Sequence, residues 1–323
     1  MMFKNLFNLE ELYLSKNRIS IIEPHCFEDL TRLKILDLSN NPLNVIQIVG
    51  LEKLEELNLE INVFPAETLK SFKLPNLKEL KLSHNSFPDI PENAFSNFRH
   101  LQILHLKDCK ISSISEKALR SSNLLKLHLD KNQLRDLPDR VFRDVPSLKE
   151  LYLNDNLFKG IPEKAFEGLK NLETLEISNN SLKYFTFKNL ARLLSLDLGY
   201  NRIDFIPKER FYGLADLKLL NATQNLISRL DEFPKNLKSL ETLDLSYNKI
   251  EKISEGAFNN LDNLNELYLY GNWISAISPD AFSPPKKLKL LDISRNNLQN
   301  LPLNAIEPLE SQIRSLKIEG EKF

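Results

Sequence analysis

Leucine and other apolar residues recur along the chain at a nearly fixed spacing. The pattern Leu-x-x-Leu-x-Leu-x-x-Asn first appears as Leu9-Glu-Glu-Leu12-Tyr-Leu14-Ser-Lys-Asn17. Its second and third leucines alternate with polar residues, which is typical of a strand buried on one side. The pattern therefore predicts one short strand in each copy. Copies begin at residues 9, 33, 54, 77, 101, 124, 148, 172, 193, 217, 240, 264, 288 and 313, and the last copy is truncated.

Stacking of the copies is the only way to bury these short strands. Copies start 21 to 25 residues apart, and such units share one continuous core when they stack. Crossovers between parallel strands are strongly biased to the right-handed form. We therefore expect an α/β fold, a right-handed curved solenoid with a parallel sheet on its concave side. Because no linker interrupts the copies, we expect a single domain over residues 1–323.

Two further positions of the repeat predict the rest of its core. The ninth position is Asn in most copies, and an amide offers two donors and an acceptor to a turning backbone. Cys109 takes this position in one copy, so we expect it to be structural and unable to pair with the distant Cys26. Phenylalanines that follow the first residue of a copy by 18 positions should stack along the convex side: Phe27, Phe95, Phe142, Phe166, Phe211, Phe258 and Phe282.

The segment that leads from one strand to the next, called the return leg below, carries a recognisable motif. Leu137-Pro-x3-Phe142 and Ala257-Phe258-x2-Leu261-x2-Leu264 resemble the 24-residue "typical" leucine-rich repeats of animal extracellular proteins. Slit, Toll-type receptors, chaoptin and the acid-labile subunit of the insulin-like growth factor complex belong to that group. The resemblance implies a binding surface for a protein, although its members share architecture rather than ligand.

Both ends of the chain differ from that family. Residues 3–9 are similar to the tail of a preceding repeat. Residues 318–323 are similar to the segment that leads into the family's cysteine cap, with Glu321 and Lys322 in place of its Asn-Pro. We therefore expect a partial ectodomain whose terminal caps are missing, with any signal peptide and membrane anchor outside this sequence.

Composition and motifs narrow the function. Lys plus Arg number 43 against 44 Asp plus Glu, a formal net charge of −1, so we expect no nucleic-acid partner. No apolar run is long enough to span a bilayer, and we expect no membrane insertion. No motif of a phosphate loop, dinucleotide site or zinc site occurs. We expect no catalysis and no cofactor or metal.

Candidate ligand contacts lie on the predicted concave side, towards the C-terminal half. Exposed Tyr and Trp clusters are often interface hot spots, and acidic residues interleave with them here. An alternative interpretation is that these are ordinary solvated strand residues. The candidate set is Tyr200, Tyr247, Tyr268, Tyr270, Trp273, Asp197 and Asp244.

A second candidate patch is basic and lies towards the N-terminal half. It consists of Lys81, His105, Lys107, Lys126, His128 and Lys131. Its histidines lie on neighbouring strands, but zinc would need further ligands. We expect the patch to steer a protein ligand rather than to anchor it.

Two sequons, Asn179-Asn-Ser181 and Asn221-Ala-Thr223, are candidate glycosylation sites. The sequence therefore favours a non-catalytic protein-binding module of an extracellular or cell-surface protein, with an adhesion, receptor or matrix role. An intracellular scaffold or adaptor in the cytoplasm is the alternative. An enzyme that uses these repeats as its recognition arm would need sequence beyond these residues. The ligand and the oligomeric state stay open.

Overall fold

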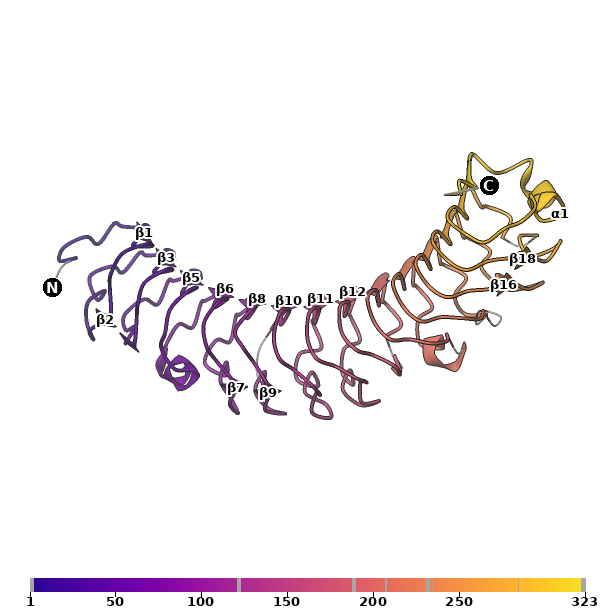
Figure 1. Cartoon of the computed structure of the whole chain (residues 1–323). Coiled ribbons are helices and arrows are strands. Elements are labelled where there is room, and N and C mark those ends of the chain that lie inside the picture. Colours follow the sequence, from indigo (N-terminus) through magenta and orange to yellow (C-terminus); the bar gives the residue numbers. More distant parts are fainter. Residues whose placement is uncertain are drawn as a thin grey trace. The chain divides into compact units, whose positions relative to one another are not determined.

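The chain folds into successive coils (Figure 1), which divide into two compact units. The computed structural model describes residues 3–120, 123–187, 190–206, 208–230, 233, 235–283 and 285–320. Unit 1 consists of Met1–Leu157 with Lys164–Leu169, and unit 2 of Phe158–Glu163 with Lys170–Phe323. The expectation of a single domain stays a prediction.

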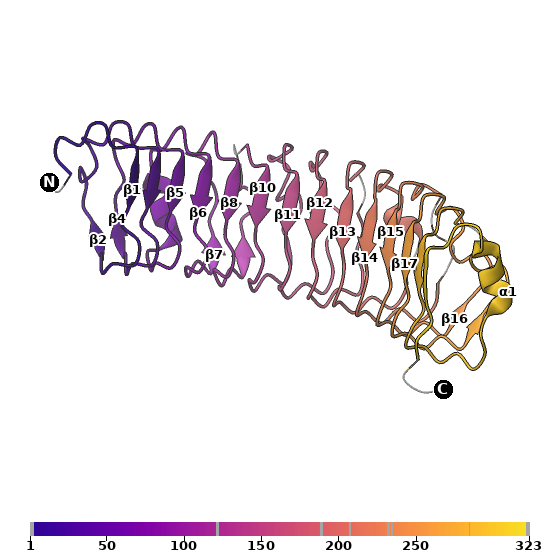
Figure 2. The same ribbon diagram turned by 90° about the horizontal axis from the view of Figure 1, so that it is seen from above.

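Each unit carries a parallel sheet with one strand per coil, in chain order (Figure 2). The sheet strands of unit 1 are β1 (Glu11–Tyr13), β3 (Ile35–Asp37), β5 (Glu56–Asn58), β6 (Glu79–Lys81), β8 (Ile103–His105), β10 (Lys126–His128) and β11 (Glu150–Tyr152). Those of unit 2 are β12 (Thr174–Glu176), β13 (Ser195–Asp197), β14 (Leu219–Asn221), β15 (Thr242–Asp244), β17 (Glu266–Tyr268), β19 (Leu290–Asp292) and β20 (Ser315–Lys317). Every strand begins two residues after a predicted copy start, and the predicted parallel-sheet solenoid is confirmed.

The return legs hold little regular structure in the described residues. Short parallel pairs join β2 (Ile21–Ile22) to β4 (Val45–Ile46), β7 (Asp89–Ile90) to β9 (Ser113–Ile114), and β16 (Lys252–Ile253) to β18 (Ala276–Ile277). The helical segments are the 3-10 turns η1 (Ala66–Ser71), η2 (Lys208–Phe211) and η3 (Glu307–Leu309) and the short helix α1 (Leu303–Ile306). Proline residues in the return legs cannot continue a helix, which explains why the helical segments there are few and short.

The repeated leucines and phenylalanines fill the core of each unit. Leu33, Leu36 and Leu38 of one copy are all fully buried. The predicted phenylalanines are buried too, and the rings of Phe142 and Phe166 stack with centroids 6.1 Å apart. Phe258 and Phe282 stack in the same way at 5.8 Å. Each such side chain contributes roughly 1.5–3 kcal/mol of burial.

The predicted amide ladder is confirmed. Asn201 donates to the carbonyls of Ile177, Leu198 and Gly199 at 3.0–3.1 Å and accepts from the backbone N–H of Leu182 at 2.9 Å. In the copy without Asn, the Cys109 thiol donates to the carbonyl of Leu82 at 3.1 Å. Burial raises the pKa of this thiol to about 12. Cys26 and Cys109 are both free.

Loss of one ladder residue should be costly. Asn201→Ala removes four hydrogen bonds and leaves buried backbone groups unpaired, so we expect a loss of about 1–3 kcal/mol in unfolding free energy. Asn297→Ala, at an exposed position beside a ladder residue, should change it by less than ~0.5 kcal/mol. Urea denaturation measures both, and equal midpoints would contradict the ladder's role.

Candidate functional site

The outward side chains of the strands form a continuous surface on each unit, called the sheet face below. In most three-residue strands a buried middle residue lies between two less buried side chains that point outwards, as Leu127 does between Lys126 and His128. The middle residues of the terminal strands β1 and β20, Leu12 and Leu316, are not buried. The surface on which we expected a ligand is therefore defined by the flanking residues of each strand.

On the sheet face of unit 1, the side chains of three neighbouring strands stack as parallel rings. The parallel register places His105, His128 and Tyr152 directly beside one another. Centroids of the two imidazoles are 4.8 Å apart, and those of His128 and Tyr152 are 4.3 Å apart, with planes within 7° of parallel. The histidine side chains remain about a quarter exposed, so ring edges face solvent.

The lysines of the predicted basic patch face carboxylates. The contacts are Lys81 with Glu56 and with Glu79 (3.5 Å), Lys107 with Asp130 (3.1 Å), and Lys126 with Glu150 (2.6 Å). Lys131 lies apart from them, on the turn after its strand. The patch is therefore not a region of unbalanced positive charge, and its role in binding stays a prediction.

Burial and neighbouring charges shift the pKa values of two groups beside the ring stack. Burial, and next the adjacent His128, lower the pKa of His105, although its Nε2 lies 3.0 Å from Glu79. Burial raises the pKa of Asp130, but contacts with His128 and Lys107 outweigh it and hold the pKa below its usual value. Asp130 Oδ1 lies 3.4 Å from His128 Nδ1, and no described residue donates a well-aligned hydrogen bond to it. Protonation of either imidazole would thus change this surface.

The acidic residues of unit 2 also close the turns that follow their strands. Asp197 accepts from the backbone N–H of Gly199 and from the amide of Asn221, both at 2.9 Å. Asp244 accepts from the N–H of Ser246 at 2.8 Å. This Asx-type bond two residues onwards is a known preference of Asp and Asn. Both carboxylates therefore stabilise local structure whatever they bind.

The predicted aromatic residues gather only in part. Tyr247 and Tyr270 meet edge to face with centroids 5.0 Å apart, and the Arg295 guanidinium lies 5.4 Å from the Tyr270 ring. Lys249 lies 5.6 Å from the ring of Trp273. Tyr247 and Trp273 are 45% and 48% exposed. These two groups of contacts lie on the turns of neighbouring copies in unit 2, and their residues are together called the aromatic edge below.

The other two tyrosines of the set lie apart from the aromatic edge. Tyr268 is on the sheet face in β17, where its hydroxyl donates to Glu266 at 3.1 Å. Tyr200 is 55% exposed but lies two copies before Tyr247.

Sequence reasoning missed a second column of side chains, which follows the turns of both units. The residue before each ladder position has a left-handed backbone, with φ between 51° and 67°. In unit 1 this turn column is Lys16, Asn40, Ile61, His84, Asp108, Lys131 and Asp155, and in unit 2 it is Asn179, Tyr200, Gln224, Tyr247, Gly271 and Arg295. The signal was available, because it is the eighth position of every copy. A side chain at Gly271 would come within 2.9 Å of the Tyr247 ring, so glycine there lets the ring lie across the turn.

A family model for the leucine rich repeat matches residues 7–64, 68–111, 122–182, 181–227, 230–274 and 263–323. The chain belongs to the leucine-rich-repeat family.

One relative is the leucine-rich repeat-containing G-protein coupled receptor 5 of Rattus norvegicus, which is 38% identical over 82 residues, 25% of this chain and 9% of that protein. Keratocan of Mus musculus is 35% identical over 113 residues, which are 32% of this chain and 31% of keratocan. The chain spans a third or less of the length of the curated relatives that it matches.

Two solved structures are similar over most of the chain. A leucine-rich-repeat protein of Leptospira interrogans superposes with a TM-score of 0.67 at 29% identity, over 97% of this chain and 86% of that one. A chain of the Toll–Spatzle complex of Drosophila superposes with a TM-score of 0.70 at 20% identity, over 93% of this chain and 45% of that one. The latter likeness concerns the fold alone.

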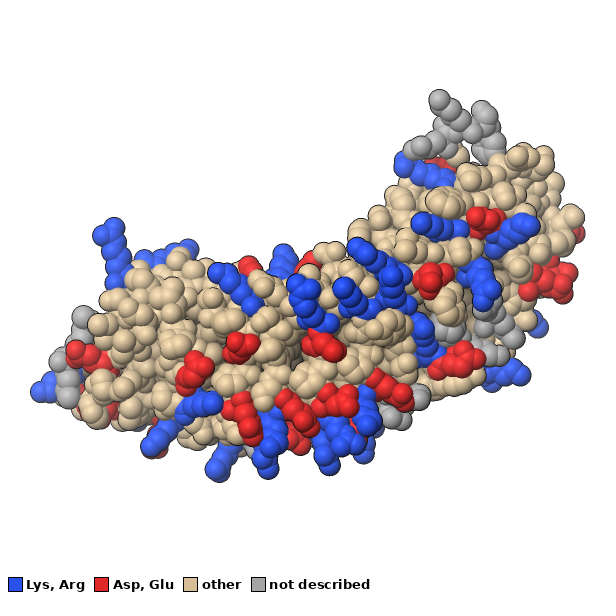
Figure 3. Space-filling view, turned by 60° about the horizontal axis from the view of Figure 1, so that its bottom comes forward, with Lys and Arg blue, Asp and Glu red and all other residues tan. Residues whose placement is uncertain are grey.

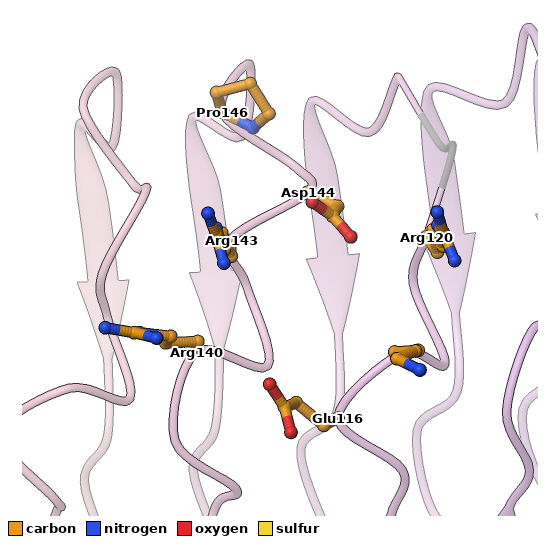
Figure 4. A pocket seen from close by; sticks show the side chains of 7 residues that line it. Glu116, Arg120, Arg140, Arg143, Asp144 and Pro146 are labelled. Carbon is orange, nitrogen blue, oxygen red and sulfur yellow. The ribbon is translucent and has the colours of Figure 1, made fainter.

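The return legs of the leucine-rich repeats in unit 1 hold a recess of about 600 Å³ (Figure 4). It is lined by Glu116, Lys117, Arg120, Arg140, Arg143, Asp144 and Pro146. Ion pairs tie Arg140 to Glu167 at 2.9 Å and Lys117 to Glu92 at 3.4 Å. Cations and carboxylates also mix over the return legs in Figure 3. This is the composition of a solvated charged face.

In the part of the chain that the structure describes, no group of three or more His, Cys, Asp or Glu side chains is arranged to hold a metal ion. Within the same residues, no helix has the length and apolar character needed to cross a membrane.

The depressed pKa of His105 should make stability depend on pH. The folded state favours the neutral imidazole, so its contribution is complete above the ordinary histidine pKa of about 6.5 and is lost as the pH falls through the lower folded value. We expect His105→Gln to reduce the loss of stability on acidification from about pH 7 to 5, the range around that ordinary value.

Urea denaturation at several pH values measures the effect. His100→Gln, at an exposed loop position, is the control and should keep the wild-type slope. An unchanged slope in His105→Gln would contradict the assignment.

Proposed function

We propose that this chain is a non-catalytic protein-binding module of an extracellular or cell-surface protein with an adhesion, receptor or matrix role. Its membership of the leucine-rich-repeat family and its similarity to keratocan support the proposal. So does the Toll–Spatzle complex, in which a protein of the same fold binds a protein. The observation that carries the proposal is the aromatic edge of unit 2.

The ligand site is the aromatic edge together with the adjoining sheet face of unit 2. A recess of about 350 Å³ adjoins Tyr270 and is lined also by Asp292, Ser294, Arg295, Lys317, Glu319 and Gly320. Large, rigid rings that remain half exposed contribute much interface energy at little entropic cost. Tyr268, Asp197 and Asp244 extend the site along the sheet, and Tyr200 extends it along the turns.

Electrostatics favours a partner with basic side chains. In unit 2 the described strands of the sheet face carry Glu176, Asp197, Asp244, Glu266 and Asp292 against Lys317. This excess of carboxylates opposes a nucleic-acid polyanion and favours a cationic protein surface. The ring stack and paired lysines of unit 1 affect association rate more than affinity.

The aromatic edge can be tested by substitution. A screen of the chain against purified secreted and cell-surface ectodomains supplies the binding partners. For a protein bound through this site, Trp273→Ala and Tyr247→Ala should each weaken binding by about 2 kcal/mol or more, roughly 30-fold in Kd.

The matched control is Tyr212→Ala, because Tyr212 is 58% exposed in the same unit but lies on a return leg. It should leave Kd unchanged. If affinity survives both aromatic substitutions and is lost on replacing Lys81, His105 and His128, the ligand site is in unit 1 instead.

The alternative function is an intracellular scaffold or adaptor, which the two unpaired cysteines favour. N-glycosylation separates the two functions. Asn179 is exposed on the turn column, whereas Asn221 lies within β14 with its amide bound to Asp197. In the extracellular case we expect a glycan on Asn179 and none on Asn221.

Glycosidase treatment of the endogenous protein, followed by electrophoresis, detects this glycan. Asn179→Gln should abolish the mobility shift and Asn221→Gln should preserve it. A cytosolic protein without a shift would favour the adaptor.

A further inference from the structure

Two apolar side chains in unit 1 are exposed on either side of a buried ladder residue. Ile61 is 48% and Val63 64% exposed, whereas Asn62 between them is 5% exposed. Both belong to the turns rather than to the sheet face. Exposed apolar groups of this size stand out when they adjoin one another.

Folding does not explain the identity of Ile61. Its φ is 54°, in the left-handed region, which is unfavourable for a β-branched residue and suits Asn, Asp or Gly. The other members of the turn column in unit 1 are polar or charged. Ile61 thus carries backbone strain and gains little burial in return, a combination that points to function.

The backbone holds both side chains in place. The N–H of Ile61 donates to Ser83 O and that of Val63 to Leu43 O, each at 3.1 Å. Asn62 donates to Leu38 O at 3.2 Å and to Leu59 O at 3.1 Å. A surface fixed in this way loses little conformational entropy when a partner binds.

The two side chains border an open recess of about 580 Å³. Its lining residues are Asn17, Asn40, Asn41, Pro42, Ile61, Asn62, Val63, His84, Asn85, Ser86, Asp108 and Lys110. His84 and Asp108 form an ion pair of 3.1 Å at its margin. The recess has room for a side chain of a partner beside Ile61 and Val63.

The charges around the recess define what fits it. Four cations lie along the turns of unit 1, in the eighth or tenth position of their copies: Lys16, Arg18, Lys110 and Lys131. This row of turns is called the turn edge below. Within the described ranges of unit 1, none of these four forms an ion pair. The carboxylates at the same two positions of unit 1 are Asp108 and Asp155, so this turn edge has more cations than carboxylates.

From this combination we infer that the turn edge around Ile61 and Val63 is a second docking surface. It binds an acidic segment of another protein that inserts one aliphatic or aromatic side chain beside these two residues. The anchor gains apolar burial, and its flanking carboxylates meet Lys110 and the neighbouring cations. The surface lies in the other unit from the aromatic edge and does not depend on the proposed ligand site there.

Three fluorescein-labelled dodecapeptides test the inference against the full chain by fluorescence anisotropy. The first has Asp and Glu around a central Leu-Phe pair, the second has Lys in place of the acids, and the third has Ser in place of the apolar pair. We expect saturable binding of the first alone. Added salt and Lys110→Glu should each weaken it several-fold.

Variants locate the surface and separate binding from folding. Ile61→Asn and Val63→Ser should each weaken the first peptide at least tenfold, while Ile61→Asn raises Tm because it relieves the left-handed strain. Val45→Ser is the matched control, since Val45 is 49% exposed in the same unit but lies in β4 on the return legs. It should leave the affinity unchanged.

Several outcomes would overturn the inference. They are no saturable binding of the first peptide, tighter binding of the lysine peptide, or equal affinity for wild type and both turn-edge variants. A lower Tm in Ile61→Asn would remove the strain argument. Self-association of the wild type in sedimentation, lost in Val63→Ser, would assign the surface to a second copy of the chain.

Discussion

The buried amide of the repeat connects each coil to the one before it, and much of the molecule's geometry follows from that bond pattern. Asn225 makes two hydrogen bonds to the preceding coil. It donates to Leu198 O at 2.9 Å and accepts from the N–H of Ile203 at 3.0 Å. It also donates to two carbonyls of its own turn. One side chain therefore closes a turn and fastens it to its neighbour. This link adds to the backbone hydrogen bonds that hold each three-residue strand in its sheet.

This ladder dictates which side chains are available for binding. To bring the amide inwards, the chain adopts a left-handed conformation at the preceding residue, and that residue's side chain points out along the turn edge. The strand residues, in contrast, present alternate side chains on the sheet face. Each unit thus offers two long columns at right angles to the strands, and both contain exposed aromatic or aliphatic groups at a few positions only.

The sheet face of unit 2 and the turn edge of unit 1 carry opposite kinds of charge. Carboxylates dominate the sheet-face strands of unit 2, while the turn edge of unit 1 carries cations that have no ion-pair partner among the described residues. A chain with a formal net charge of only −1 can therefore present surfaces of opposite preference. Half-buried carboxylates such as Asp197 also stabilise their turns, so their removal would alter local structure as well as charge.

The sequence by itself determined the repeat, the strand positions, the buried leucines and the amide ladder, because these depend on periodic contacts between identical positions in adjacent coils. Even the substitution at Cys109 was interpretable, since its thiol occupies the same place under the turn. Side-chain partners required the tertiary structure. The pairing of Lys126 with Glu150 depends on the register of β10 and β11. It is one of the ion pairs that balance the charge of the predicted basic patch. The contact of Tyr247 with Tyr270 depends likewise on where each ring lies relative to its turn. Periodicity states which positions are equivalent, but only the packed coils decide which unlike residues meet between them.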